Sequence, residues 1–368
     1  MKIGVDARPL AFPRNGNARY LFDMLMGLLS ARKPDCYVLY SHRPIHSDYR
    51  TPLERRGVTF REDTSWTAKT GLLFLNTRVI QWLRQDQCDL YWGSLSMLPL
   101  FFRARAHIPC MVNFHDLNAY SAPETMTFAN RIQHLLTNGH TLRNADSVLC
   151  LSQTTADDIA ATFPWTQGRL ELVYPGVELK PLKPRKPESI GLKAFYLMVS
   201  TIEPRKNQGT VVTAYRNARK KSRTLLPLVV VGRQGWGSAD LHSMLASRKL
   251  ESEGIFYIEE ADDSILEWCY ARARLYLFPS LHEGFGLPIL EAGFRNIPMA
   301  LSDIPIFREV APSAAFAPPL DVAAWEALLN HPPRKGIKFK RKDWTLENRS
   351  ARILEIAQKL VLQPRPRK

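Results

Sequence analysis

Two glutamates, Glu283 and Glu291, bracket a glycine turn in the stretch LYLFPSLHEGFGLPILEAGF, residues 275–294. The apolar run at 275–278 predicts a short buried strand, and Pro288 suits the first turn of a helix that follows the glycines. Glycine lets the backbone approach a ligand closely, and the free N–H groups at a helix N-terminus attract anions. The spacing therefore predicts an anion-binding turn with a carboxylate on each side.

The separation of Glu283 and Glu291 limits what the two carboxylates can do together. Eight helical residues would rise about 12 Å with a rotation of about 80°, whereas the paired carboxyl groups of glycosidases lie about 5 to 9.5 Å apart. We therefore expect Glu283 to face a sugar from the turn, and Glu291 to face a different group one or two helical turns later. For either residue, a glutamate on a solvated helix face is the alternative.

A cationic doublet, Arg205 and Lys206, follows another predicted strand at 194–200 and precedes Asn207, which can begin a helix. Cations beside a helix N-terminus form a phosphate site, and a surface charge pair is the alternative. A third strand, at 228–231, ends at Gly232 in the sequence VVVGRQGWG, which is not the dinucleotide fingerprint.

His115 and Asp116 end the apolar strand expected at 110–115. Ligands of α/β proteins bind at the carboxyl ends of parallel strands, which favours a functional histidine over a purely structural one. Asp116 either orients His115 or caps the segment that follows. The polar loop after the first strand carries Asn15, Gly16 and Asn17, and an ordinary connecting loop is the alternative for it.

Apolar runs alternate with helical patterns, which predicts an α/β fold with parallel sheets. The Pro-rich, basic segment 177–187 predicts a linker, so we expect two Rossmann-like, doubly wound domains that face each other across a cleft. Their boundaries are 1–180 and 188–345, followed by a terminal helix and basic tail at 346–368. Expected strands are 2–6, 37–41, 89–92, 110–115, 148–152, 170–173, 194–200, 228–231, 255–258, 275–278, 299–302 and 314–316; expected helices include 19–29, 72–84, 128–143, 154–162 and 346–360.

Composition narrows the class of partner. Lys and Arg number 50 against 35 Asp and Glu, a net charge of +15, which favours an anionic partner. No nucleic-acid module accompanies the charge, so we expect no nucleic acid. Five scattered cysteines without Cys-x-x-Cys indicate reduced thiols. The absence of a long apolar run, and the charges near the start, predict a cytoplasmic protein.

The string EGFGLP at 283–288 with Glu291 resembles the E-x7-E motif of retaining glycosyltransferases of family GT4, which have the GT-B fold. EPRKN at 203–207 is similar to that family's motif as well, and the resemblance covers nearly the whole chain. It implies a nucleotide-diphospho-sugar donor and a last helix that crosses back to the first domain. It also implies site roles: Glu283 and His115 face the donor sugar, the amides of Gly284, Phe285, Gly286 and Leu287 contact the sugar and diphosphate, Arg205 and Lys206 hold the diphosphate, Glu291 holds the ribose, and Gly232 lies beside the base.

Two departures from the family pattern are visible. The loop near the diphosphate and acceptor usually reads Gly-Gly-x-Gly-Arg-Tyr, and here Asn15 and Ala18 replace glycines. The stretch FRNIP at 294–298 stands where the family usually has a small residue and a glycine before the proline. Asparagine tolerates the left-handed backbone conformation better than most residues, so Asn296 can take the place of that glycine.

The motifs are most similar to bacterial enzymes that add mannose or a related deoxyhexose to cell-surface polysaccharide, such as O-antigen and lipopolysaccharide. GDP-mannose is the expected donor and GDP-rhamnose the alternative. No Asp-x-Asp occurs, so no metal or other cofactor is expected. A lipid-linked acceptor on an anionic membrane surface, at the inner face of the cytoplasmic membrane, would explain the basic charge. The amphipathic segments 70–84 and 98–105 either pack on the sheet or touch that membrane. A sugar-nucleotide epimerase and a non-catalytic polyanion-binding protein are the rival functions.

Overall fold

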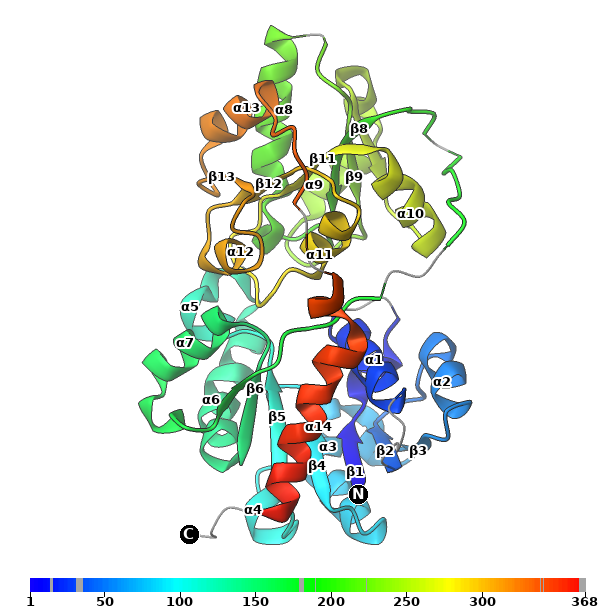
Figure 1. Cartoon of the computed structure of the whole chain (residues 1–368), viewed down its shortest axis with the longest axis vertical. Coiled ribbons are helices and arrows are strands. Elements are labelled where there is room, and N and C mark those ends of the chain that lie inside the picture. Colours follow the sequence, from blue (N-terminus) through cyan, green and yellow to red (C-terminus); the bar gives the residue numbers. More distant parts are fainter. Residues whose placement is uncertain are drawn as a thin grey trace. The chain divides into compact units, whose positions relative to one another are not determined.

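The computed structural model describes residues 1–13, 16–30, 36–178, 182–188, 190–222, 224–337, 339 and 341–363. The chain divides into two compact units. Unit 1 comprises Met1–Glu178 together with Lys342–Lys368, and unit 2 comprises Leu179–Arg341. Each unit is an α/β domain around one parallel sheet (Figure 1).

The sheet of unit 1 has seven strands in the order β3-β2-β1-β4-β5-β6-β7. Every neighbouring pair is parallel. Because β1 pairs with both β2 and β4, the strand order reverses direction beside β1, and such a switch point is where α/β proteins bind ligands. The strands are β1 (Lys2–Asp6), β2 (Cys36–Ser41), β3 (Thr59–Glu62), β4 (Leu90–Gly93), β5 (Cys110–Phe114), β6 (Ser147–Cys150) and β7 (Leu170–Leu172).

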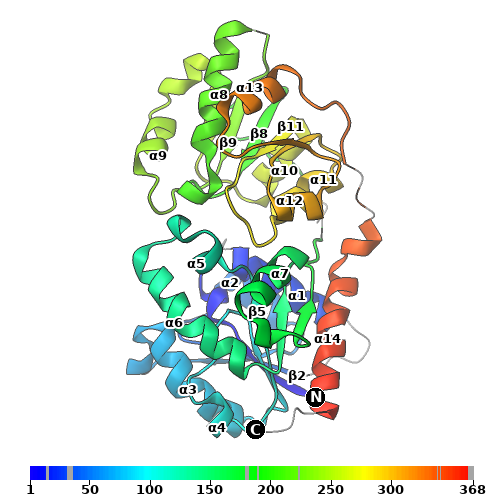
Figure 2. The ribbon, with the colours of Figure 1, turned by 90° about the vertical axis from the view of Figure 1, so that its left-hand side faces the viewer.

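Helices cover both faces of this sheet, which is why its central strands are apolar on both sides. One core cluster joins the sheet to α1 and α14, and a second joins it to α3, α6 and α7. Figure 2 shows α14 on one side of the strands, and α3 and α6 on the other. The helices of unit 1 are α1 (Gly16–Leu29), α2 (Ser47–Glu54), α3 (Gly71–Gln85), α4 (Phe102–Arg105), α5 (Asn118–Ser121), α6 (Phe128–Asn144), α7 (Gln153–Thr162) and α14 (Leu346–Leu362).

The terminal helix α14 returns to unit 1 and packs on α1, which confirms the predicted crossover (Figure 1). Gly27 of α1 permits the close approach. A methyl group at Gly27 would lie 2.6 Å from the Ser350 hydroxyl oxygen and 2.7 Å from the Leu346 carbonyl oxygen. Beside this contact, the Val177 amide donates to the Trp344 carbonyl over 2.9 Å, which ties together the two segments at the boundary of the units.

Unit 2 repeats the same plan with six parallel strands, in the order β10-β9-β8-β11-β12-β13. Its switch point lies between β8 and β11, which are paired neighbours. The strands are β8 (Phe195–Val199), β9 (Leu228–Val231), β10 (Ile255–Ile258), β11 (Ala273–Phe278), β12 (Met299–Ser302) and β13 (Ala315–Ala317). The helices are α8 (Gln208–Lys221), α9 (Ala239–Ala246), α10 (Asp263–Arg272), α11 (Leu287–Phe294), α12 (Pro305–Val310) and α13 (Val322–Asn330).

Two local expectations were wrong. Helix α1 begins at Gly16, three residues before the predicted start, so Gly16 and Asn17 belong to its first turn rather than to a loop. Strand β3 was not predicted, because Thr59–Glu62 carries one apolar residue among polar ones, as suits the edge of a sheet. The predicted loop residue Asn15 lies outside the described residues.

Candidate functional site

The carboxyl ends of β8 and β11 place the two principal motifs of unit 2 side by side. The segment after β8 forms the short 3-10 helix η5 (Pro204–Lys206), and the segment after β11 forms the turn that leads into α11. The Leu281 amide donates to the Arg205 carbonyl over 2.8 Å, and the Asn207 side chain donates to the Pro279 carbonyl over 3.1 Å. Backbone contacts therefore hold the two loops together at the switch point.

Glu283 is the centre of a charged cluster between these loops. Its carboxylate accepts from Arg205 Nη1 over 2.7 Å, from Lys206 Nζ, and from the Ser280 hydroxyl over 2.8 Å. Arg205 also donates through Nη2 to Glu203 over 2.9 Å. Glu283 is only 7% exposed, so these contacts compensate a charge that water barely reaches. Two cations predicted to hold a diphosphate and the glutamate predicted to face a sugar are thus brought into direct contact.

The cluster fixes the ionisation of its members. Burial alone would raise the pKa of Glu283, but the charges of Arg205 and Lys206, with hydrogen bonds from Lys206 and Ser280, lower it to about 2. Burial lowers the pKa of Lys206, and the charge of Glu283 opposes that shift. The Lys206 ammonium also lies 5.3 Å from the centre of the Phe278 ring, a cation–π distance. At neutral pH Glu283 is therefore a carboxylate that accepts hydrogen bonds and cannot donate a proton.

The glycine turn that follows Glu283 leads straight into α11. Gly286 has φ of +94° and precedes the first helical residue, Leu287. A side chain at Gly286 would need this left-handed conformation and would crowd Ile289 and Phe307, so glycine suits the position. Phe285 is buried and anchors the turn, and Gly284 lies between Glu283 and this anchor.

Glu291 lies on α11, and Tyr270 of α10 contacts it. The Tyr270 hydroxyl donates to Glu291 Oε2 over 2.8 Å. Within the described residues the second carboxylate oxygen, Oε1, has no hydrogen-bond partner, so it can accept from a ligand hydroxyl. Glu291 and Glu283 have separate sets of partners, as expected from their spacing.

Gly232 brings the end of β9 against the end of β8. Its φ is +153°, and an ideal Cβ there would lie 1.8 Å from the Ser200 carbonyl oxygen, so no larger residue fits without a shift of the backbone. The Tyr257 hydroxyl donates to the Gly232 carbonyl over 2.6 Å. These contacts fix the loop after β9 at the carboxyl ends of the strands, where Arg205 also lies.

In unit 1, a pocket of about 460 Å³ lies at the carboxyl ends of the strands. His115 follows β5 and lines this pocket with Asp116 and Asn17. His115 Nε2 lies 2.9 Å from the Ser94 carbonyl oxygen, and a carbonyl only accepts, so Nε2 carries the proton. Burial lowers the pKa of His115, against the opposing effects of the Ser94 carbonyl and Asp116. The neutral ring therefore has Nδ1 available as an acceptor.

The structure places the remaining predicted residues of unit 1 in three different surroundings. Asp116 Oδ1 accepts from the Asn118 amide over 3.2 Å, so Asp116 caps the turn that becomes α5. Gly16 has no atom within 4 Å of an ideal Cβ, so neither space nor a positive φ requires glycine there. Asn17 lines the pocket from the first turn of α1.

Comparison with known proteins decides the family. The family described as "Glycosyl transferases group 1" matches residues 180–330, and the one described as "Glycosyltransferase Family 4" matches residues 14–180. The chain is a GT4 glycosyltransferase. GT4 enzymes are retaining glycosyltransferases with the GT-B fold, so this chain is an enzyme of that class.

Individual GT4 relatives and a solved structure agree with this assignment. The chain is 26% identical to "O-antigen chain mannosyltransferase B" of Escherichia coli over 348 residues, 89% of each chain. It is 26% identical to "O-antigen chain mannosyltransferase RfbU" of Salmonella typhimurium over 298 residues, 78% of this chain and 79% of the relative. Among solved structures, Anabaena HepE in complex with UDP and glucose shares the fold, with a TM-score of 0.67, 17% identity, and coverage of 99% and 100% of the two chains.

Three residues that contact the predicted site residues were not themselves predicted to belong to the site. Ser280, Glu203 and Tyr270 all contact the motif residues through hydrogen bonds. Glu203 belongs to the EPRKN motif and Ser280 stands three residues before Glu283, so both could have been suspected from their positions, whereas Tyr270 lies on a different helix, α10. In the part of the chain that the structure describes, no three His, Cys, Asp or Glu side chains gather so as to hold a metal ion.

Proposed function

We propose that this enzyme transfers a hexose from a nucleotide-diphospho-sugar to a saccharide acceptor in the synthesis of bacterial cell-surface polysaccharide. GDP-mannose is the proposed donor, because two relatives matched over most of their length are O-antigen mannosyltransferases. GDP-rhamnose is the alternative donor. The observation that carries the proposal is the cluster of Arg205, Lys206 and Glu283 at the switch point of unit 2.

The diphosphate leaving group gains negative charge as its bond to the sugar breaks. Arg205, Lys206 and the amides at 284–287 would stabilise that charge, and each preorganised donor contributes about 3 kcal/mol. The two side-chain cations supply the charge without a metal. In the proposed step the acceptor oxygen bonds to the anomeric carbon on the face that the phosphate leaves, and the acceptor proton passes to the departing phosphate oxygen.

Unit 2 is the proposed donor domain, with predicted bounds 188–345, and unit 1 the proposed acceptor domain. In unit 2, Glu291 Oε1 would accept from the ribose, and the loop at Gly232 would lie beside the base. In unit 1, the neutral His115 ring would accept from a sugar hydroxyl through Nδ1, because its Nε2 proton already faces the Ser94 carbonyl.

A lipid-linked acceptor requires a membrane surface, and unit 1 exposes apolar side chains that suit one. On α6, Phe128 and Leu136 are 78% and 75% exposed, and Ile132 between them is also exposed. These residues recur every four positions and form one stripe along the helix. We name this set, with the exposed Leu100 and Phe101, the apolar stripe of unit 1.

Basic residues accompany the apolar stripe, which favours an anionic lipid surface as its partner. Arg103 and Arg105 are exposed on α4 beside Phe101, and Arg131 is exposed on α6. The Arg105 guanidinium lies 5.0 Å from the centre of the Phe101 ring. By contrast, the apolar face of α3 is buried in the core, so segment 70–84 packs on the sheet. No helix among the described residues is long and apolar enough to cross a bilayer, so the proposed attachment is peripheral.

The donor proposal is tested by thermal shift with a panel of nucleoside diphosphates and their sugars. A ligand that binds only the folded protein stabilises it by about 2.7 kcal/mol at a concentration 100 times its Kd. We expect GDP-mannose to raise the melting temperature most, and the double variant Arg205→Ala with Lys206→Ala to lose the response. A response to DNA without any response to nucleotides would favour the polyanion-binding alternative, and conversion of the donor without an acceptor would favour an epimerase.

The membrane proposal is tested by sedimentation with vesicles of phosphatidylcholine with and without phosphatidylglycerol. We expect binding only to the anionic vesicles, and its loss in the variant Phe128→Ser with Leu136→Ser. Leu320→Ser is the matched control, because Leu320 is 70% exposed in unit 2. Equal binding by the α6 variant and the control would contradict the role of the stripe.

A further inference from the structure

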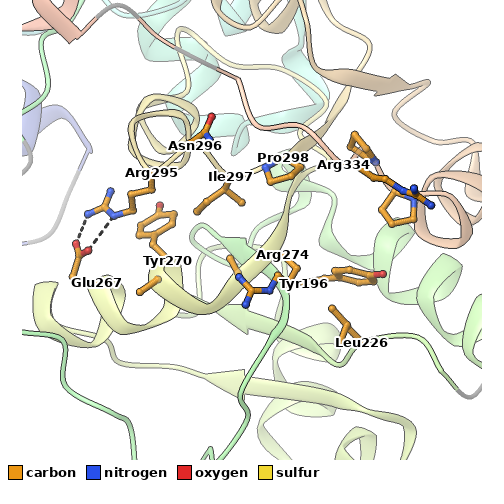
Figure 3. Close-up of a pocket in the computed structure, with 14 residues that line it drawn as sticks. Tyr196, Leu226, Glu267, Tyr270, Arg274, Arg295, Asn296, Ile297, Pro298 and Arg334 are labelled. Atoms are coloured by element: carbon orange, nitrogen blue, oxygen red, sulfur yellow. Dashed lines mark hydrogen bonds and ion pairs between the residues drawn. The ribbon is translucent and has the colours of Figure 1, made fainter.

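Unit 2 contains a pocket at the amino ends of its strands. Arg205 and Glu283 follow the opposite, carboxyl ends. The pocket has a volume of about 480 Å³ (Figure 3). Tyr196 and Arg274 line it from the starts of β8 and β11, and Pro298 lines it just before β12. The donor-side loops follow the other ends of these strands, so the proposed donor site does not account for this pocket.

Two arginines give the pocket its charge. Arg274 and Arg334 are both exposed, and neither has a hydrogen-bond or ion-pair partner among the described residues. Arg274 occupies a β-bulge, since the register between β8 and β11 shifts between Ala273 and Leu275. A bulge re-aims a side chain, and Figure 3 shows Arg274 in the middle of the lining residues with Arg334 toward one end. Unpaired guanidinium groups in a pocket favour a phosphoryl or carboxylate ligand.

Side-chain contacts hold the wall of the pocket opposite Arg334. They also connect this wall to Glu291 on the donor side. Arg295 pairs with Glu267, and its guanidinium lies 4.7 Å from the centre of the Tyr270 ring. Arg295 Nη1 donates to the Glu291 carbonyl over 2.8 Å, and the Tyr270 hydroxyl donates to the Glu291 carboxylate over 2.8 Å. Tyr270 and Arg295 therefore line the pocket and also hold both the backbone and the side chain of Glu291.

This wall also includes part of the stretch 294–298, which departs from the GT4 family pattern. The proposed donor site does not explain that departure. Arg295 and Asn296 both line the pocket. Asn296 has φ of +57°, the left-handed conformation that a glycine would adopt there. Within the stretch 294–298, which departs from the family pattern, this chain thus places two polar side chains, Arg295 and Asn296, beside the pocket.

We propose that this pocket binds a phosphorylated small molecule, whose phosphoryl group pairs with Arg274 while Arg334 adds positive charge at one end of the pocket, and whose presence changes donor affinity through Tyr270 and Arg295. The phosphoryl group belongs to a free sugar phosphate or to inorganic phosphate, which carry the same recognition chemistry. The binding part stands on unit 2 alone, and only the effect on the donor depends on the proposed function.

Binding is tested by isothermal titration at low salt with inorganic phosphate and, separately, glucose 6-phosphate. We expect saturable binding in the wild type and a loss of at least about tenfold in affinity in Arg274→Ala with Arg334→Ala. A matched control, Arg216→Ala with Arg248→Ala, removes two charges elsewhere in unit 2 and should change affinity by less than about twofold. Tighter binding of glucose 6-phosphate than of phosphate would identify a sugar phosphate as the ligand, and equal binding would identify phosphate.

Two results would overturn the binding proposal: unchanged affinity in the pocket variant, or an equal loss in the control variant. Arg205→Ala with Lys206→Ala should retain this binding, and a loss there would assign the anion to the donor site instead. Both pocket arginines are exposed and unpaired, so circular dichroism should show a folded variant.

The effect on the donor is tested by the Kd of GDP-mannose with and without saturating glucose 6-phosphate. We expect a change of at least about fivefold in the wild type and none in Tyr270→Phe. A wild-type Kd that does not change would refute this coupling and leave the binding result intact. If GDP-mannose fails to bind at all, the proposed function fails, whereas the titration with phosphate still decides the pocket.

Discussion

Glu283→Gln tests the charged cluster most directly, because it removes one charge and keeps the shape of the side chain. The lowered pKa of Glu283, about 2 instead of 4.5, means that the folded protein favours the ionised carboxylate. The difference of about 2.5 pKa units corresponds to about 3 kcal/mol at about 1.4 kcal/mol per unit. Glu283 is 7% exposed, so solvent screening reduces this figure little.

The sign of the pH dependence follows from the direction of the shift. A carboxylate whose pKa is lower in the folded state stabilises the protein above its unfolded pKa, and this stability is lost as the pH falls through the folded pKa. Here the loss begins near pH 5 and is complete only below pH 2. Between pH 5 and pH 3 the two pKa values give a loss of about 2 kcal/mol. Glutamine does not titrate, so Glu283→Gln should lack this component.

The measurement is the free energy of unfolding by urea, at several pH values from about 5.5 down to about 3. The wild type should lose about 2 kcal/mol more than Glu283→Gln over this range. Glu291→Gln is the matched control, since its side-chain partner is a tyrosine hydroxyl rather than a cation, and it should follow the wild-type curve. Parallel curves for the wild type and Glu283→Gln would refute the ion pairing derived for this cluster.

Three further predictions concern single residues. Arg205→Ala should lower kcat at least about tenfold in a transfer assay. In the same assay Arg216→Ala, which removes the ion pair between Arg216 of α8 and Glu253, should leave kcat unchanged. Gly286→Ala should lower the free energy of unfolding by about 1–2 kcal/mol because of its φ of +94°. By contrast, Gly209→Ala, inside α8 with open space where the added Cβ would lie, should raise it by up to about 1 kcal/mol. His115→Ala should lower kcat far more than it lowers the urea midpoint, because the neutral ring has one nitrogen available for substrate, whereas its other nitrogen makes one hydrogen bond, to the Ser94 carbonyl.

For each of these predictions, one result would contradict it. Unchanged turnover in Arg205→Ala would remove its role in holding the diphosphate. Equal stability of the two glycine variants would mean that the turn relaxes at no cost. A fall in the urea midpoint of His115→Ala that matches its loss of activity would make the histidine structural.

The strands could be predicted closely because most of them are central and parallel. Such strands are buried on both faces and appear as short, uninterrupted apolar runs, as in Leu228–Val231 and Ile255–Ile258. Edge strand β3 lacks this pattern and was missed. The start of α1 was also missed, since the helix begins at Gly16 and has no acidic residue to mark its first turn.

The motif residues could be named from the sequence, but their mutual pairing could not. Arg205 and Glu283 are 78 positions apart, and each was predicted to face the ligand. Their contact depends on strand order, which places β8 beside β11, and strand order is not encoded in the local pattern. The same reason hides Tyr270, which reaches Glu291 from a neighbouring helix.

Helix α6 shows that the spacing of apolar residues does not by itself tell which face of a helix is buried. Phe128, Ile132 and Leu136 have the spacing of a buried face, yet all three are exposed. The buried positions of α6 are Asn138, Thr141 and Leu142. Thr141 accepts from the Leu98 amide over 3.1 Å, so a polar contact replaces apolar packing on the inner face. Periodicity predicts a helix, but it does not tell whether protein or another apolar partner covers the stripe.

The pairing inside the cluster also determines how its variants must be interpreted. Removing one partner of a buried ion pair leaves the other charge uncompensated, which costs about 3–5 kcal/mol. Arg205→Ala and Glu283→Gln each have this consequence, so lost activity in either variant combines lost substrate contacts with a weakened fold. The double variant leaves less charge unpaired, and it should recover stability relative to the sum of the single variants. Because that recovery concerns the fold alone, activity that stays low in the stabilised double variant is activity lost through the contacts of Arg205 and Glu283 with the substrate.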